Sequence, residues 1–166
     1  MGLLKPWRCI ASVDRIDIDA LLREGVRCVL IDRDNTCVPR DDTVAPPEIL
    51  DWLARAREAG MRTMMVSNNT HKRAVARSSA ELGCEAVAPA FKPVPFALGI
   101  AMRQAGVTAD QTVMVGDQVF TDVIAGNLAG VRTILVRPQS EKDLWYTLII
   151  RRIDRAIFGE RTFEGE

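Results

Sequence analysis

Histidine and paired cysteines are scarce in this sequence. It has one histidine, His71, and four cysteines that stand apart from one another without a Cys-x-x-Cys pair. A structural zinc site or a secreted disulfide framework needs clusters of these residues, so the sequence indicates neither class of protein.

Net charge and long apolar runs are also missing. The chain has 22 basic and 22 acidic residues, so no excess of positive charge points to nucleic acid as a partner. Its apolar runs all fall short of the roughly 20 residues that cross a bilayer. Lys5, Pro6 and Arg8 interrupt the short apolar start, where a signal peptide would be continuous. These absences predict a cytoplasmic protein that does not bind nucleic acid.

Short apolar runs alternate with segments of helical periodicity along most of the chain. Buried strands are predicted over 29–31, 62–66, 85–87, 112–116 and 132–136, and helices over about 47–59, 71–82, 94–104 and 119–128. Strands that alternate with helices form right-handed crossovers and a parallel sheet that is covered on both faces. We therefore predict a three-layer α/β sandwich. A single domain spans 1–166, with a core at 26–137, a leader at 1–25 and a carboxyl-terminal amphipathic helix at about 141–158.

Asp32 and Asp34 end the first predicted strand, two residues apart. Strand periodicity places residues i and i+2 on the same side, so both carboxylates can face one crevice beyond the strand's carboxyl end. Two like charges this close are costly unless a cation or a proton lies between them. A site that uses one carboxylate as nucleophile and another as proton carrier has this layout. For the spacing alone, the alternative is an acidic, solvated turn that continues through Asn35 and Thr36.

Polar side chains also follow the later strands, at the same predicted edge of the sheet. They are Ser67 and Asn68 after the second strand, Lys92 after the third, and Asp117 and Asp122 after the fourth. The carboxylates of this set can hold a metal with oxygen ligands, and magnesium is the favoured ion. A serine hydroxyl, a lysine ammonium and nearby backbone N–H groups suit a phosphate. Together these groups predict transfer of a phosphoryl group to Asp32, with Asp34 as acid and base.

Each residue also has a purely structural explanation when it is taken alone. Lys92 could be a solvated loop lysine, and Ser67 could cap the helix that begins near residue 70. Asp122 could simply favour the dipole of a helix start, and Gly116 could only allow a tight turn. All of these explanations would have to hold independently at neighbouring strand ends, so the functional interpretation is favoured for the set.

In this order the residues resemble the four motifs of the haloacid dehalogenase (HAD) superfamily. The matching segments are Asp32-x-Asp34-x-Thr36, Ser67 after a strand, Lys92-Pro93, and Gly116-Asp117-x-x-x-x-Asp122. The resemblance covers about 29–136 and implies a Rossmannoid sheet of order 3-2-1-4-5, a magnesium ion and phosphatase chemistry. It implies that Asp32 is the nucleophile and Asp34 the acid/base, and that Mg²⁺ is held by Asp32, the backbone carbonyl of Asp34, and Asp117. It also implies that phosphate is bound by Ser67, Asn68 and Lys92. The supporting residues that it implies are Thr36, Gly116 and Asp122.

No cap domain is predicted. Larger members of the superfamily insert one between the first and second or the second and third motifs, and here 36–67 and 67–92 are too short for it. The resemblance therefore narrows to capless phosphatases of the YqeG type, to which phosphatidylglycerophosphate phosphatases are similar. Arg33 and Cys37 depart from that group, which usually has an apolar residue and leucine there. The Asp-Arg-Asp start is instead similar to histidinol-phosphate and heptose-bisphosphate phosphatases, which typically have Gly at position 35 and a zinc loop that this chain lacks.

The segment at about 141–158 has an apolar stripe that is flanked by arginines. Such a helix could lie on an anionic membrane surface or pack on the domain or a second subunit, and packing is favoured. The leading hypothesis for function is a magnesium-dependent phosphomonoesterase of phosphatidylglycerophosphate, cytoplasmic or peripheral on the inner face of the membrane. The alternatives are a soluble phosphatase of a sugar phosphate, nucleotide or phosphoprotein, and a non-catalytic phosphate-binding scaffold.

Overall fold

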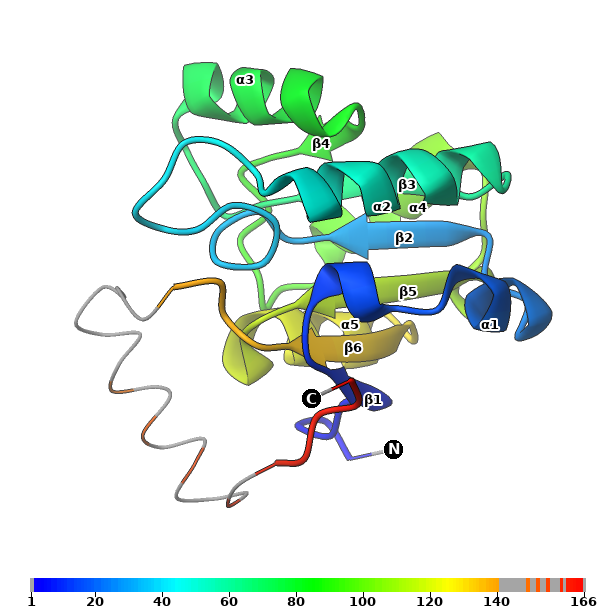
Figure 1. Ribbon diagram of the computed structural model, residues 1–166. Helices are drawn as coiled ribbons and strands as arrows, with labels where there is room; N and C mark the ends of the chain where they lie inside the picture. The colour runs from blue at the N-terminus through cyan, green and yellow to red at the C-terminus, as the bar shows by residue number, and fades with distance from the viewer. Residues whose placement is uncertain are drawn as a thin grey trace.

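The computed structural model describes residues 2–140, 149, 152, 155, 159 and 161–165. Within this part of the chain, six parallel strands form one sheet in the order β1-β6-β5-β2-β3-β4 (Figure 1). The strands are β1 (Arg8–Ile10), β2 (Cys28–Ile31), β3 (Arg62–Val66), β4 (Glu85–Val87), β5 (Thr112–Gly116) and β6 (Arg132–Val136).

The predicted order 3-2-1-4-5 is confirmed, because the five predicted strands are β2 to β6 and lie as β4-β3-β2-β5-β6. The structure adds a sixth strand that was not predicted. β1 comes from the leader and pairs with β6 at the edge of the sheet, Arg8 opposite Ile134 and Ile10 opposite Val136. The leader is thus part of the sheet. After the segment that begins at residue 141, Glu164 returns beside β1, where its N–H donates to the Cys9 carbonyl at 2.9 Å.

Helices cover both faces of the sheet, as the three-layer prediction requires. α2 (Pro47–Glu58) lies on one face, with α1 (Ile18–Arg23) and α3 (Lys72–Leu82) on the same side, and α4 (Phe96–Ala105) and α5 (Ile124–Leu128) lie behind (Figure 1). β2 alternates between the two layers: Val29 and Ile31 join the core under α2, whereas Cys28 and Leu30 join the core under α4. Both cores consist of buried apolar side chains, so β2 is buried along its whole length.

The predicted helix boundaries follow from Pro and Gly. Pro47 begins α2, because its missing N–H is unpaired in a first turn anyway. Gly83 and Gly106 end α3 and α4 in the left-handed conformation, with φ of 64° and 69°. The predicted helix at 119–128 is instead a π-helical turn, Val119–Val123, followed by α5. Two short 3₁₀ turns, Val13–Arg15 and Ala109–Gln111, complete the described helical elements.

The carboxyl ends of the strands meet at one edge of the sheet, on the left in Figure 1. The described segments from β2 to β3 and from β3 to β4 each hold one helix, and no cap domain is present among the described residues. Nor does any helix in these described residues have the length and apolar character to cross a bilayer. The predicted amphipathic helix at about 141–158 falls on residues that lie outside the described part, apart from 149, 152 and 155.

Candidate active site

The loop after β2 carries the first motif and is held to the neighbouring strand. The Asp32 N–H donates to the Val115 carbonyl of β5 at 2.9 Å, so the Asp32 side chain leaves the sheet at a fixed point. Asn35 turns the loop with φ of 62°, a conformation that asparagine tolerates better than most residues. Its buried Oδ1 accepts hydrogen bonds from the Arg40 N–H at 3.0 Å and the Ser140 hydroxyl at 2.9 Å. This one residue therefore fixes the turn that carries the acids.

The loops after β3 and β4 are joined through Asn68. Its side-chain amide donates to the Lys92 carbonyl at 3.0 Å and accepts from the Lys92 N–H at 2.7 Å. Asn68 was predicted to bind phosphate; the structure uses its side chain to hold the backbone of Lys92. The Lys92–Pro93 peptide bond is cis.

Ser67 is fully buried at the end of β3. Its hydroxyl accepts from the Asn69 N–H at 3.1 Å, and its carbonyl accepts from the Ala90 N–H at 2.8 Å. The alternative that Ser67 caps α3 does not match the structure, because the cap position is His71 and the Ser67 hydroxyl accepts from the Asn69 N–H instead. Ser67 instead shapes a local turn beside the Lys92 loop.

Lys92 reaches into the site and contacts two carboxylates. Its Nζ lies 2.7 Å from Asp32 Oδ1 and 2.6 Å from Asp122 Oδ1, and the lysine side chain is 2 % exposed. The alternative of a solvated loop lysine is therefore wrong. Such a buried ammonium is stable only with partners of opposite charge, and here it has two.

Asp122 projects inward from the π-helical turn after β5. Its Oδ1 accepts from Lys92 and its Oδ2 accepts from the Gln118 N–H at 3.1 Å, so it does more than favour a helix dipole. Gly116 makes room for it. A Cβ on Gly116 would lie 2.2 Å from the Asp122 carboxyl carbon, a distance that real atoms do not reach. The glycine is required by this close approach and not by a positive φ.

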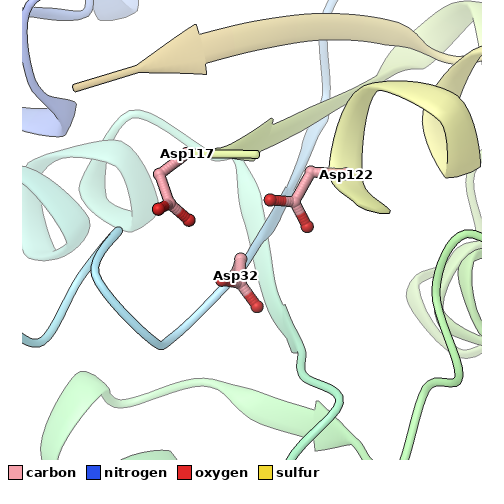
Figure 2. Close-up of side chains that lie close together, drawn as sticks. All are labelled: Asp32, Asp117 and Asp122. Carbon is pink, nitrogen blue, oxygen red and sulfur yellow. The ribbon is translucent and has the colours of Figure 1, made fainter. Parts of the chain in front are cut away.

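Three buried carboxylates converge at the centre of this edge. Asp32, Asp117 and Asp122 each offer an oxygen, and these oxygens lie within 4.8 Å of one another. Figure 2 shows the three carboxyl groups turned toward a common space, from the loop after β2, the end of β5 and the helical turn. The Thr36 hydroxyl donates to Asp117 Oδ1 at 3.3 Å, which helps to fix that carboxylate.

The pKa values of Asp32 and Lys92 both lie above their ordinary values, but for different reasons. Burial raises the pKa of Asp32 to about 7 from the ordinary 3.8; Lys92 opposes this rise, and Asp122 and Asp34 add to it. For Lys92, burial acts to lower the pKa, but Asp122 and Asp32 together raise it well above its ordinary value. The ammonium is therefore charged at every physiological pH. In the metal-free protein, Asp32 readily takes a proton near neutral pH.

The donor set fits a magnesium ion. All of the convergent ligands are carboxylate oxygens, which magnesium prefers to nitrogen or sulfur. One lysine among three buried carboxylates leaves strong mutual repulsion, and a divalent cation would offset it. Both oxygens of Asp122 accept hydrogen bonds from the protein, which suits Asp122 to a supporting role beside the ion.

Asp34 lies at the rim, with its side chain 30 % exposed. Arg33 Nη1 lies 2.5 Å from Asp34 Oδ1, and Arg33 Nε donates to the Ser78 hydroxyl of α3 at 2.5 Å. The arginine that departs from the related group thus links the predicted acid/base to α3. Cys37, the other departure, is fully buried, and burial raises its pKa well above the ordinary value, so it packs as a neutral thiol.

The structure brings Asp32, Lys92, Asp117 and Asp122 together, as the motif order predicts, with Thr36 and Gly116 in supporting contacts. Sequence reasoning did not find the roles of Asn35, Arg33 or Gln139, whose side chain donates to the Thr36 carbonyl at 3.1 Å. Asn35 had a detectable signal, since an asparagine after paired acids suits a left-handed turn. The other two depend on partners that are distant in sequence.

Comparison with known proteins agrees with this geometry. Residues 89–148 match the family model described as HAD-hydrolase-like. The chain is 33 % identical over 160 residues to the probable phosphatase YqeG of Bacillus subtilis (strain 168), covering 96 % of this chain and 92 % of that protein. It is 26 % identical over 158 residues to the chloroplastic/mitochondrial phosphatidylglycerophosphate phosphatase 1 of Arabidopsis thaliana, covering 90 % of this chain but only 45 % of the plant protein.

A solved structure resembles the fold. It is the cobalt-bound deoxy-D-mannose-octulosonate 8-phosphate phosphatase of Haemophilus influenzae, with a TM-score of 0.56, 20 % sequence identity, and coverage of 68 % of this chain and 69 % of that one. At this identity the likeness concerns the fold alone.

Proposed function

Because the chain belongs to the HAD-like hydrolases, related over nearly its whole length to a probable phosphatase, we propose that it is a magnesium-dependent phosphomonoesterase acting through a phosphoaspartyl intermediate. The observation that carries the proposal is the buried lysine between two carboxylates. Lys92 contacts Asp32 and Asp122 at 2.7 and 2.6 Å, in a cluster whose third carboxylate is Asp117. Buried charged groups do not stabilise an apolar core, whereas phosphoryl transfer requires charged groups at the reacting centre.

In the first step, an Asp32 oxygen forms a bond to phosphorus while the ester P–O bond breaks. Lys92 holds one oxygen of Asp32 and supplies positive charge for the phosphoryl oxygens. The departing alkoxide takes a proton from Asp34, whose exposed position at the rim suits a group that meets the leaving alcohol. The products of this step are the free alcohol and an aspartyl phosphate on Asp32.

In the second step, Asp34 accepts a proton from the water that attacks phosphorus, and the acyl phosphate linkage breaks. Inorganic phosphate leaves and Asp32 is regenerated. Ser67, buried beside the Lys92 loop, is proposed to contribute a phosphate contact, and Thr36 and Gly116 keep Asp117 and Asp122 in place. Magnesium, held by Asp32, Asp117 and the backbone carbonyl of Asp34, would supply a Lewis acid that draws charge from the transferring group.

We further propose phosphatidylglycerophosphate as the substrate, and a location in the cytoplasm or at the inner face of the membrane. The support is the similarity to a plant enzyme of that name and the lack of a cap among the described residues, because an open site suits a phosphate presented on a large body. The chain spans about half the length of that plant relative, so the proposal concerns the shared domain. A soluble sugar phosphate, nucleotide or phosphoprotein substrate is the alternative.

The test compares wild type, Asp32→Asn and Asp51→Asn in hydrolysis of an aryl phosphate, with and without Mg²⁺. Asp51 is a matched control because it is an exposed acid that pairs with Arg55 on α2. Asp32→Asn should lose about 10³-fold or more of the activity, and Asp51→Asn should lose none. Equal inactivity of all three proteins with every divalent metal would leave the non-catalytic scaffold as the better interpretation. A panel of phosphatidylglycerophosphate, sugar phosphates and nucleotides then ranks the substrates.

A further inference from the structure

The loop that carries Lys92 exposes three large apolar side chains at the edge of the site. Phe91, Val94 and Phe96 are 67 %, 54 % and 74 % exposed, and they lie on both sides of a lysine that is buried. Nearby residues of the same stretch, Ala90 and Leu98, are packed in the core. The chain could therefore bury apolar residues here, yet it presents these three to the outside. Large exposed apolar side chains that lie this close together in the sequence of one loop indicate an interaction surface.

The loop is held in place, so its exposure is a fixed feature of the fold. Asn68 bonds to both the N–H and the carbonyl of Lys92, and the Val94 N–H donates to the Phe91 carbonyl at 3.0 Å. The phenylalanines stand on either side of this turn. A surface that receives Phe91 contacts the residue next to the lysine that contacts Asp32.

Two cationic residues follow the loop that contacts Lys92. Asn68, which bonds to Lys92, is followed within a few residues by Lys72 and Arg73, and both are exposed. The first turn of α3 contains no acidic residue, and a helix start adds a partial positive charge of its own. Apolar side chains next to cations are what an anionic lipid surface binds, since the first enter the acyl boundary and the second pair with headgroups.

We propose that Phe91, Val94 and Phe96 insert into the surface of an anionic bilayer, with Lys72 and Arg73 on its headgroups. This inference rests on the proposed function, because it gives the site access to a phosphate ester that resides in the membrane. The loop then has two tasks: its buried lysine holds Asp32, and its exposed residues bring the edge of the site to the lipid. The alternative is that the loop inserts into a pocket on a protein partner, and the experiment distinguishes this from binding to a bilayer.

The experiment measures retention of the full chain on sedimented vesicles of phosphatidylcholine, with or without phosphatidylglycerol, without substrate. The variant is Phe91→Asn with Phe96→Gln; asparagine suits position 91, where φ is 53°. The control is Leu128→Gln, because Leu128 is 53 % exposed but ends α5, which runs back to the opposite edge of the sheet. Aryl phosphate hydrolysis is measured on the same preparations.

Wild type and Leu128→Gln should be retained on the anionic vesicles, and the double variant should lose about tenfold or more of this affinity. Lys72→Gln with Arg73→Gln should weaken retention on anionic vesicles only. Aryl phosphate hydrolysis should be unchanged in all four proteins. If wild type is not retained, or the double variant is retained equally well, the inference is wrong.

Two further results would also overturn it. Loss of aryl phosphatase activity in the double variant with vesicle retention intact would place the phenylalanines in a pocket for small substrates. Loss of phosphoprotein hydrolysis with retention intact would assign the loop to a protein partner. Failure of the proposed function is distinguishable, since it appears as missing aryl phosphatase activity in wild type, whatever the vesicles show.

Discussion

Replacing Lys92 with methionine should destabilise the metal-free protein strongly. Methionine keeps most of the volume of the side chain but removes the ammonium that Asp32 and Asp122 share. At about 2.7 Å and an effective dielectric constant of 20, each pair gains roughly 6 kcal/mol of Coulomb energy, which the desolvation of the three charges largely cancels. Truncating one partner leaves the others buried without compensation. We therefore expect a loss of about 3–5 kcal/mol in the free energy of unfolding.

The pH dependence of this loss follows from Asp32. Its pKa in the wild-type fold is about 7, above its unfolded value of 3.8, so its contribution to stability is full below about pH 4 and is lost as the pH rises through 7. Without Lys92, which lowers this pKa, the folded variant keeps the proton to higher pH than wild type does. Above pH 7 the cost of the substitution should therefore grow, by at most about 1.4 kcal/mol per pH unit for one proton.

The assay is urea unfolding in the presence of a metal chelator at about pH 7 and 9. Arg55→Met is the matched control, because Arg55 lies 2.8 Å from Asp51 but both side chains are more than half exposed. This control should lose only about 0.3–0.5 kcal/mol. If Lys92→Met costs no more than Arg55→Met, or if its cost shrinks as the pH rises, the reasoning about the buried cluster is refuted.

Three further predictions concern the same edge of the sheet. Gly116→Ala should lose most of the phosphatase activity and about 1–3 kcal/mol of stability, because its Cβ would overlap a carboxyl group. The control Gly99→Ala in α4, where a Cβ meets open space, should be at least as stable as wild type. Urea unfolding and phosphatase assays of the two variants test this prediction. Magnesium affinity, measured by calorimetry, should rise with pH through about 7, because Asp32 must lose a proton to bind the ion, and a flat profile would contradict the pKa shift. Asn68→Ala should lower kcat more than it raises KM, since it releases the backbone of Lys92 without removing its charge, and an unchanged kcat would deny it a positioning role.

The strands and the acids at their ends were predictable because their signals are local. β2, β3 and β5 are short apolar runs that stop at a polar residue, and parallel order then brings those residues to one edge. Lys92 and Asp122 were found by motif order, although their contact spans 30 residues. β1 was not predicted, because it is only three residues long, includes Arg8 and shows no strand pattern in the sequence. It forms a strand because it pairs with the edge of β6.

Several site contacts could not be derived from the sequence, because they join side chains to distant partners. Arg33 contacts Ser78 across 45 residues, and only the fold reveals that α3 passes there. From the sequence Gly116 could be a turn residue, and only the position of Asp122 in the fold shows that it makes room for a carboxyl group. The resemblance implies that Asn68 binds phosphate, and only the fold reveals that its amide also bonds to the backbone of Lys92 in both directions.

Asn35 joins the loop that carries the proposed nucleophile to the two residues Gln139 and Ser140 by hydrogen bonds. Its carbonyl accepts from the Gln139 N–H at 2.8 Å and its Oδ1 accepts from the Ser140 hydroxyl, while Gln139 also donates to the Thr36 carbonyl. The turn between Asp34 and Thr36 is thus fixed by two residues that follow β6, so its conformation depends on a segment more than 100 positions away in the sequence.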